Sequence, residues 1–158
     1  MDIYEACENK MIAIGQNFDD FDNTLRYLNE EEGVVIVADV ISNINIEHKM
    51  DMHDLMWSND CESPELLITF GKSFISKNLK QFFRKNPPKY HWHIQVSDVI
   101  FDPLQSISHR INMSPEVFLK ELADCITQRR LKNYDIEEQE YFETWDKKNK
   151  ALKIKYFD

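Results

Sequence analysis

Glycine, proline and cysteine are all scarce in this sequence. Its 158 residues include three Gly, five Pro and three Cys. The few glycines exclude a linker-rich chain, and the sequence contains neither a GxxxxGK[ST] nor a GxGxxG loop for cradling phosphate. Phe70-Gly71-Lys72-Ser73 looks like the end of such a loop but lacks its first glycine, so we interpret Gly71 as a position of close packing. The odd number of cysteines, none in a CxxC spacing, favours a reducing cytoplasmic location over a disulfide framework.

Long apolar stretches are missing as well. The longest apolar run, Val34 to Ala38, is far shorter than the roughly 18 residues of a membrane span. The first fifteen residues lack the basic and apolar regions of a signal peptide. Hydrophobic residues make up 42% and aromatic residues 12% of the chain, which excludes general disorder. We therefore expect a single domain over residues 1–158, with no membrane segment.

Positive charge is almost absent from the first third of the chain. Residues 1–60 hold 14 Asp and Glu but three Lys and Arg, whereas residues 61–90 hold two acidic and six basic residues. The remainder is nearly balanced, and the net charge is −9. Such a one-signed acidic segment attracts a cationic partner and repels nucleic acid and anionic membranes. A short basic stripe with Tyr90 and Trp92 nearby is the feature that favours nucleic acid, and the acidic segment opposes it.

Apolar periodicity and capping residues predict four helices, over about residues 2–14, 19–32, 64–84 and 115–132. Strands are predicted at 34–41, at 44–46 as a short partner, and at 90–101. Residues 140–145 and 151–157 flank a polar turn and predict a C-terminal β-hairpin. The predicted fold is α+β: an antiparallel or mixed sheet of four to five strands, with about four helices packed mostly on one face.

Catalytic and metal signatures are weak. His91 and His93 are two apart, so on a strand both imidazoles face the same side and could converge on a metal ion. The spacing fixes no third ligand among His48, His53, Cys61 and His109, which leaves the pair as weak metal candidates. Ser106 and Ser108 lie close to His109, but no nucleophile motif surrounds them. We therefore predict no catalytic residue, no metal, no cofactor and no enzymatic activity.

The charge pattern gives the functional hypothesis. A small acidic chain without catalytic signature is typical of a bacterial immunity protein or antitoxin that covers the positive cleft of a basic toxin such as a nuclease. The predicted contacts are the acidic residues at both ends of the second helix and one nearby aromatic: Asp19, Asp20, Asp22, Glu30, Glu31, Glu32 and Trp57. The alternatives are a metal-binding or hydrolytic domain that uses His91 and His93, and an adaptor or structural subunit. Self-association does not follow from the sequence.

Overall fold

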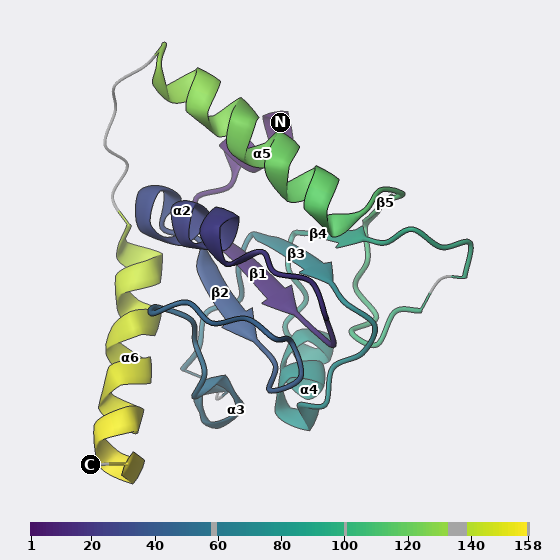
Figure 1. The fold of residues 1–158 in the computed structure, drawn as a ribbon. Coiled ribbons are helices and arrows are strands. Elements are labelled where there is room, and N and C mark those ends of the chain that lie inside the picture. Colours follow the sequence, from purple (N-terminus) through teal and green to yellow (C-terminus); the bar gives the residue numbers. More distant parts are fainter. Residues whose placement is uncertain (58–59, 100, 133–138, 158) are drawn as a thin grey trace.

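A five-stranded sheet, parallel throughout, forms the centre of the protein (Figure 1). The computed structural model describes residues 1–57, 60–99, 101–132 and 139–157. The strands lie in the order β2-β1-β3-β4-β5. Their bounds are β1 Lys10–Ile14, β2 Val35–Ala38, β3 Leu66–Phe70, β4 Tyr90–Ile94 and β5 His109–Ile111. All four neighbouring pairs are parallel.

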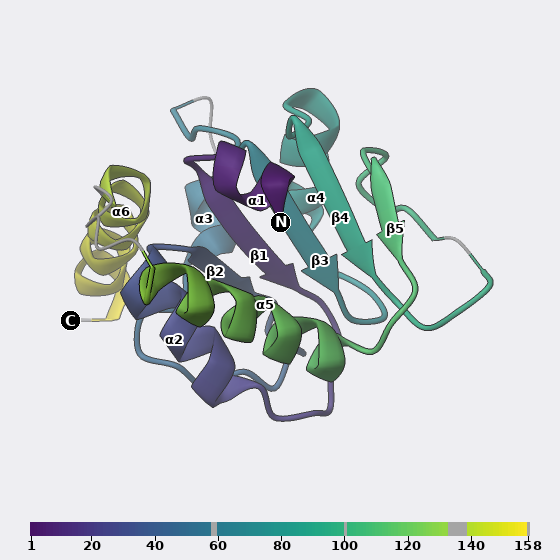
Figure 2. The same ribbon diagram turned by 90° about the horizontal axis from the view of Figure 1, so that it is seen from above.

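Helices cover both faces of this sheet (Figures 1 and 2). One face carries α1 (Asp2–Ala6), α2 (Asp22–Glu32) and α5 (Pro115–Arg130). The other face carries α3 (His53–Met56), α4 (Lys77–Lys85) and α6 (Glu140–Phe157). The architecture is therefore a three-layer α/β sandwich. In the described part of the chain, none of the helices is long and apolar enough to cross a membrane.

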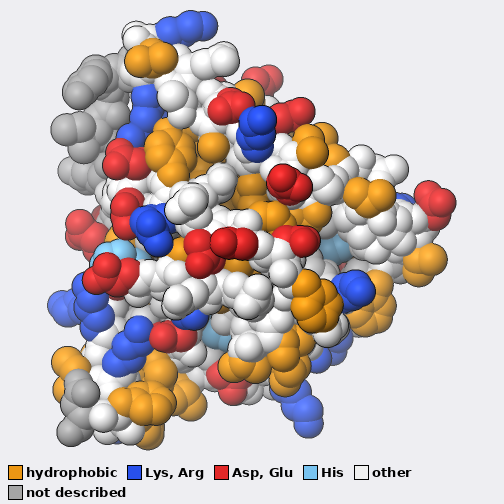
Figure 3. All heavy atoms as spheres, viewed as in Figure 1, with side chains coloured by type: hydrophobic (Ala, Val, Ile, Leu, Met, Phe, Trp, Pro, Cys, Tyr) orange, Lys and Arg blue, Asp and Glu red, His pale blue; other side chains and the backbone are white. Residues whose placement is uncertain are grey.

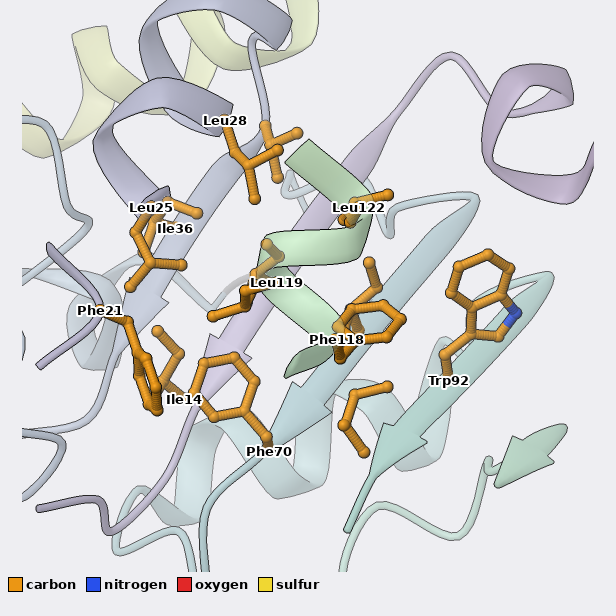
Figure 4. Packing of buried hydrophobic residues seen from close by; sticks show 14 of the residues in the cluster. Ile14, Phe21, Leu25, Leu28, Ile36, Phe70, Trp92, Phe118, Leu119 and Leu122 are labelled. Carbon is orange, nitrogen blue, oxygen red and sulfur yellow. The ribbon is translucent and has the colours of Figure 1, made fainter. Parts of the chain in front are cut away.

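The register of the strands sorts their side chains between two apolar cores. Ile36, Ile12, Ile68 and Trp92 form one row across the sheet, in contact with the layer of α2 and α5. Figure 4 shows leucines from α2 and from α5 meeting the strand residues Ile14, Ile36 and Phe70. The row that faces α2 and α5 belongs to the first core. Alternate strand residues face α3, α4 and α6 and belong to the second core, so the inner strands of the sheet are buried on both sides.

The predicted α+β fold with an antiparallel or mixed sheet is wrong, because the sheet is wholly parallel and has helices on both faces. Two strands were taken for helix. Residues 10–14 and 66–70 are apolar at nearly every position, since central parallel strands are buried on both faces. A continuous apolar run satisfies a helical period as well as a strand.

The C-terminal β-hairpin is also wrong. Residues 140–157 form one helix, α6, whose Tyr141, Phe142, Trp145 and Leu152 pack on the second core. The predicted turn contains no Gly or Pro, and Asp146 instead pairs with Lys150 one helical turn later, at 2.6 Å. Buried Asn149 accepts a hydrogen bond from the Met52 amide at 3.0 Å and so ties α6 to the loop before α3.

Helices α2 and α5 confirm two of the predicted elements. Gly33 ends α2 in the left-handed region, with φ of 61°. Ser114 caps α5 by accepting a hydrogen bond from the Val117 amide, and Pro115 occupies the first turn. The strand predicted at 34–41 is present as β2, whereas residues 44–46 form no strand.

Candidate functional site

The carboxyl ends of the parallel strands all lie along one edge of the sheet, here called the carboxyl edge. From β1 the chain moves outward to β2 on one side, and from β3 it moves outward to β4 and β5 on the other. This reversal places a topological switch point between β1 and β3. In open α/β sheets, ligands bind in the crevice outside the strand ends at such a point. The loops after β1 and β3 are therefore the first place to look for a site.

The two loops at the switch point fill that crevice with their own backbone. The Gln16 amide donates to the Ser73 carbonyl at 2.7 Å, and the Lys72 amide donates to the Gln16 carbonyl at 2.9 Å. A Cβ added at Gly15 would lie 2.4 Å from the Ser73 oxygen, and one added at Gly71 would lie 2.8 Å from the Gly15 carbonyl carbon. The interpretation of Gly71 as a close-packing position is thus confirmed, although it lies after a strand and not within a helix.

Asp39 fixes the neighbouring strand end. It directly follows β2, is 4% exposed, and its carboxylate accepts hydrogen bonds from the amides of Ile75 at 2.7 Å and Ser76 at 3.3 Å. Ser76 in turn caps α4 by accepting from the Leu79 amide. The carboxylate is thus used to hold the loop before α4 against the end of β2. Sequence reasoning missed this role, although an acid directly after an apolar strand was visible.

A shallow hollow of about 440 Å³ lies beside the switch point. It is lined by loop residues that follow β1 and β2, namely Gln16, Asn17, Phe18, Val40, Ile41 and Asn43. Amides and apolar groups make up this lining, and it includes no charged side chain. The hollow therefore offers neither cations for a phosphate nor carboxylates for a metal ion.

The two predicted metal candidates lie in a buried hydrogen-bonded chain on β3 and β4. His91 Nε2 and His93 Nδ1 both contact Thr69 Oγ1, at 2.7 and 2.8 Å. His91 Nδ1 contacts Ser106 Oγ at 2.8 Å, and His93 Nε2 contacts Gln95 Oε1 at 2.8 Å. The two imidazoles do share one face of the strand, as predicted, but Thr69 binds to both of them.

The directions of these hydrogen bonds follow from the Gln95 end. Its amide oxygen can only accept, so His93 Nε2 donates and His93 Nδ1 accepts from the Thr69 hydroxyl. Thr69 then accepts from His91 Nε2, which leaves His91 Nδ1 to accept from Ser106. This order of hydrogen bonds applies when both rings are neutral. Burial accordingly lowers the pKa of His91 to about 4.

This arrangement does not favour metal binding. All ring nitrogens of His91 and His93 are occupied by hydrogen bonds. Within residues 1–57, 60–99, 101–132 and 139–157, no group of three or more His, Cys, Asp or Glu side chains could hold a metal ion. A histidine with a pKa near 4 is also a weak general base at neutral pH, so the Ser106–His91 contact has little nucleophilic value.

The predicted acidic contacts fall into different environments. Glu32 is 2% exposed at its side chain and pairs with Arg129 at 3.0 Å and with Arg130 at 2.7 Å. Glu31 also pairs with Arg130, at 2.7 Å. The end of α2 is therefore neutralised by the end of α5, about a hundred residues later in the chain. Glu30 is exposed.

The remaining predicted contacts lie near the start of α2 and near α3. Asp19 and Asp20 are exposed in the loop after β1, while Asp22 accepts a hydrogen bond from the Asn45 amide at 3.0 Å. Trp57 is half-buried in the second core, with its ring centroid 5.2 Å from that of Trp145. The structure thus does not bring the seven residues together on one surface patch, and Trp57 packs against the second core with part of its side chain exposed. Their binding to a partner stays a prediction.

Comparison with known proteins identifies the family. Residues 8–150 match the family described as "Middle domain of thiamine pyrophosphate". The chain belongs to this family of enzyme middle domains. Since the match covers most of the chain, the predictions of a non-enzymatic immunity protein or antitoxin and of a basic toxin as its partner are wrong.

Three similar curated proteins share the name 2-succinyl-5-enolpyruvyl-6-hydroxy-3-cyclohexene-1-carboxylate synthase. The chain is 34% identical to the enzyme of Porphyromonas gingivalis over 122 residues, which cover 74% of this chain and 21% of the relative. It is 29% identical to that of Flavobacterium johnsoniae over 131 residues, covering 76% and 23%. It is 40% identical to that of Bacteroides thetaiotaomicron over 67 residues, covering 42% and 12%. The chain therefore spans less than a quarter of the length of these relatives.

The family name raises the question of whether this chain itself holds thiamine pyrophosphate. A diphosphate needs free backbone amides or cations, and an accompanying metal ion needs carboxylate or amide oxygens. At the switch point the amides of Gln16 and Lys72 are already bonded to carbonyl groups. The neighbouring hollow has no charged lining, and the described residues form no metal cluster. The residues present do not fit the cofactor, and no catalytic step is assigned to them.

Proposed function

We propose that this chain serves as the middle domain of a 2-succinyl-5-enolpyruvyl-6-hydroxy-3-cyclohexene-1-carboxylate synthase. The observation that carries the proposal is the family match over residues 8–150 together with relatives that carry this one enzyme name. The chain contributes a rigid α/β body, and the thiamine pyrophosphate is held by other parts of the enzyme. We also propose that residues 1–158 form one domain and that this domain is located in the cytoplasm. The three unpaired cysteines support the location.

The filled switch point supports an architectural role for the chain. Interlocked loops after β1 and β3 leave no crevice for a nucleotide-like ligand, and the buried histidines hold each other through Thr69. Both features stabilise the sheet without presenting a reactive group. A domain of this kind positions the parts of an enzyme that carry the chemistry, and it is not expected to react itself.

A segment exchange tests the proposal. In the Porphyromonas gingivalis enzyme, the segment that aligns with this chain is replaced by the corresponding residues of this chain, and formation of the compound that the enzyme is named after is followed by mass spectrometry. The expected result is product well above that of a synthase from which the segment is deleted. A soluble, folded exchange protein that forms no more product than the deletion would refute the proposal.

A matched variant shows that the product depends on the fold of the exchanged segment. Ile36 is fully buried at the centre of the first core. Ile36→Asp places an unpaired carboxylate there and is expected to unfold the segment. The exchange protein with this substitution should lose product formation. If it kept the activity, the segment would be dispensable and the proposed role would be wrong.

A further inference from the structure

Large apolar side chains are exposed along the carboxyl edge of the sheet. Thirteen large hydrophobic residues are exposed in the described chain, and six of them lie on the loops that follow β1, β2, β3 and β4. These six, called here the apolar rim, are Phe18 (72%), Val40 (85%), Ile75 (57%), Val96 (68%), Val99 (73%) and Phe101 (58%). Figure 3 shows hydrophobic side chains on the projection that the loop after β4 forms.

The opposite edge of the sheet differs. Among the described residues of the loops that lead into β1, β2, β3 and β4, none is a large hydrophobic residue that is exposed, whereas the loop that leads into β5 is the one that follows β4 and carries Val96, Val99 and Phe101. Isolated exposed apolar side chains are normal on any protein. Their recurrence after four successive strands, β1 to β4, is the pattern of an interaction surface.

The rim follows the order of the strands. Phe18 and Val40 line the same hollow, after β1 and β2. Ile75 is joined to the end of β2, because its amide donates to the carboxylate of Asp39, the residue before Val40. The loop after β4 continues the edge beyond β3. Phe18, Val40, Ile75 and Val96 thus lie within five residues of a strand end along the carboxyl edge, and Val99 and Phe101 lie further along the loop that follows β4.

We propose that the apolar rim is the surface on which the thiamine pyrophosphate-binding part of the synthase docks. This inference rests on the proposed function. The matched segment is less than a quarter of each of the three relatives described above, so most of such an enzyme lies outside it and is available to cover an exposed edge. A partner that fits this rim presents an apolar face with basic side chains opposite Asp19 and Asp20, which are exposed beside Phe18.

Charge argues against a second copy of this chain as the occupant. The net charge is −9 per copy, and Asp19, Asp20 and Asp98 are exposed on the loops that carry the rim. Pairing two rims would bring these acids together and cost free energy by like-charge repulsion. Lys72 offsets part of this charge, but its ammonium group already lies 5.8 Å from the centre of the Phe18 ring.

Site-specific photo-crosslinking tests the surface. A photoreactive amino acid is placed at Val40 in the rim or, as a matched control, at Leu131 after α5, which is 83% exposed. The protein is made in its own organism, crosslinked there, and the joined peptides are identified by mass spectrometry. We expect Val40, and not Leu131, to crosslink to thiamine pyrophosphate enzyme sequence outside residues 1–158.

Several outcomes would overturn the proposal. Crosslinks from Val40 to residues 1–158 of a second molecule, distinguished by mixed isotope labelling, would make the rim a homodimer interface. Crosslinks to an unrelated protein, equal crosslinking from Leu131, or no crosslink from Val40 would each exclude the docking surface. None of these results depends on whether the exchanged synthase described above is active.

Substitutions in the exchanged synthase separate the two proposals. Val40→Asp should lower product formation by about tenfold or more, because docking would bury an unpaired charge, while Leu131→Asp should leave it unchanged. Neither substitution should change the melting temperature of the chain alone, since both sites are exposed. An active exchange protein that Val40→Asp does not affect would refute the rim and leave the proposed function standing. An inactive exchange protein alongside the expected Val40 crosslinks would refute the synthase assignment alone.

Discussion

Alanine substitutions at the three glycines test how the switch point is closed. Gly71 has φ of 96°, and a Cβ there would meet the backbone of the neighbouring loop at 2.8–2.9 Å. Gly15 has no positive φ, but its Cβ would lie 2.4 Å from the Ser73 carbonyl oxygen. Gly33 has φ of 61°, and the three atoms nearest to its Cβ would all belong to the flexible side chain of Gln139. The three positions therefore separate backbone strain from steric overlap.

The expected losses follow from these two costs. Gly33→Ala should lower the unfolding free energy by about 1 kcal/mol, mainly because alanine is strained in a left-handed conformation. Gly15→Ala should lower the unfolding free energy by about 2 kcal/mol, mainly because the added Cβ overlaps with backbone that cannot rotate away. Gly71→Ala combines backbone strain with overlap and should lower the unfolding free energy by about 3 kcal/mol or more. The expected order of destabilisation is therefore Gly71→Ala, then Gly15→Ala, then Gly33→Ala.

Urea unfolding followed by far-ultraviolet circular dichroism measures the three losses, and equal slopes of free energy against urea would show that the same surface is exposed in each case. Amide exchange of the loops after β1 and β3 should rise in the variants of Gly15 and Gly71 and stay unchanged in Gly33→Ala. If Gly71→Ala lost no more stability than Gly33→Ala, the two loops would not be in backbone contact. The argument that the crevice is filled would then fail.

Three further substitutions test the buried polar groups. His91→Gln should remove a pH dependence of stability. The folded pKa of His91, about 4, lies below the unfolded value of 6.5, so the wild type keeps full stability above pH 6.5 and loses about 3 kcal/mol of unfolding free energy as the pH falls to 4. Equal losses of stability in wild type and variant, measured by urea titration at pH 7 and pH 5, would contradict this. Glu32→Gln should cost about 2 kcal/mol, because its buried carboxylate holds two arginines, whereas the exposed pair of Glu31 makes Glu31→Gln cost less than about 1 kcal/mol; equal melting temperatures would disprove the difference. Asn149→Ala should cost about 2 kcal/mol and raise amide exchange throughout α6, where Lys150→Ala serves as the control; unchanged exchange would show that Asn149 does not hold the helix.

Helices with a clear boundary were predictable from the sequence. Ser114-Pro115 starts α5, and Gly33 ends α2, because each residue satisfies a local backbone requirement that does not depend on the rest of the fold. The apolar stripe between such boundaries then needs only one face of the helix. Local capping and one-sided burial are properties of a segment, so they are visible in that segment.

Central strands were not predictable in the same way. Met11 to Ile14 and Leu66 to Phe70 face a helical layer on each side, so they show no alternation of polar and apolar residues. Their parallel direction depends on crossovers, yet between β2 and β3 the described crossover contains only the four-residue helix α3. The regular alternation of strand and helix that marks a doubly wound sheet was therefore hidden.

The charge pattern misled the functional hypothesis for a similar reason. Glu31 and Glu32 belong to the acidic third in sequence, but the fold pairs them with Arg129 and Arg130. A net charge summed over a segment contains no information on such distant partners. Asp19 and Asp20, two of the acidic residues that stay exposed, lie beside apolar Phe18 at the carboxyl edge.

The sequence does lack a glycine-rich phosphate loop, but it did not follow that the chain has no part in an enzyme. A glycine-rich motif is needed where a backbone approaches a ligand, but at this switch point Gly15 and Gly71 let two loops approach each other instead. The absence of the motif therefore does not bear on whether the chain is part of an enzyme. The crevice between β1 and β3 is filled, and the hollow beside it, which Phe18 and Val40 line, has no charged side chain in its lining. The docking proposed above would account for an edge whose rim is apolar while its centre is closed.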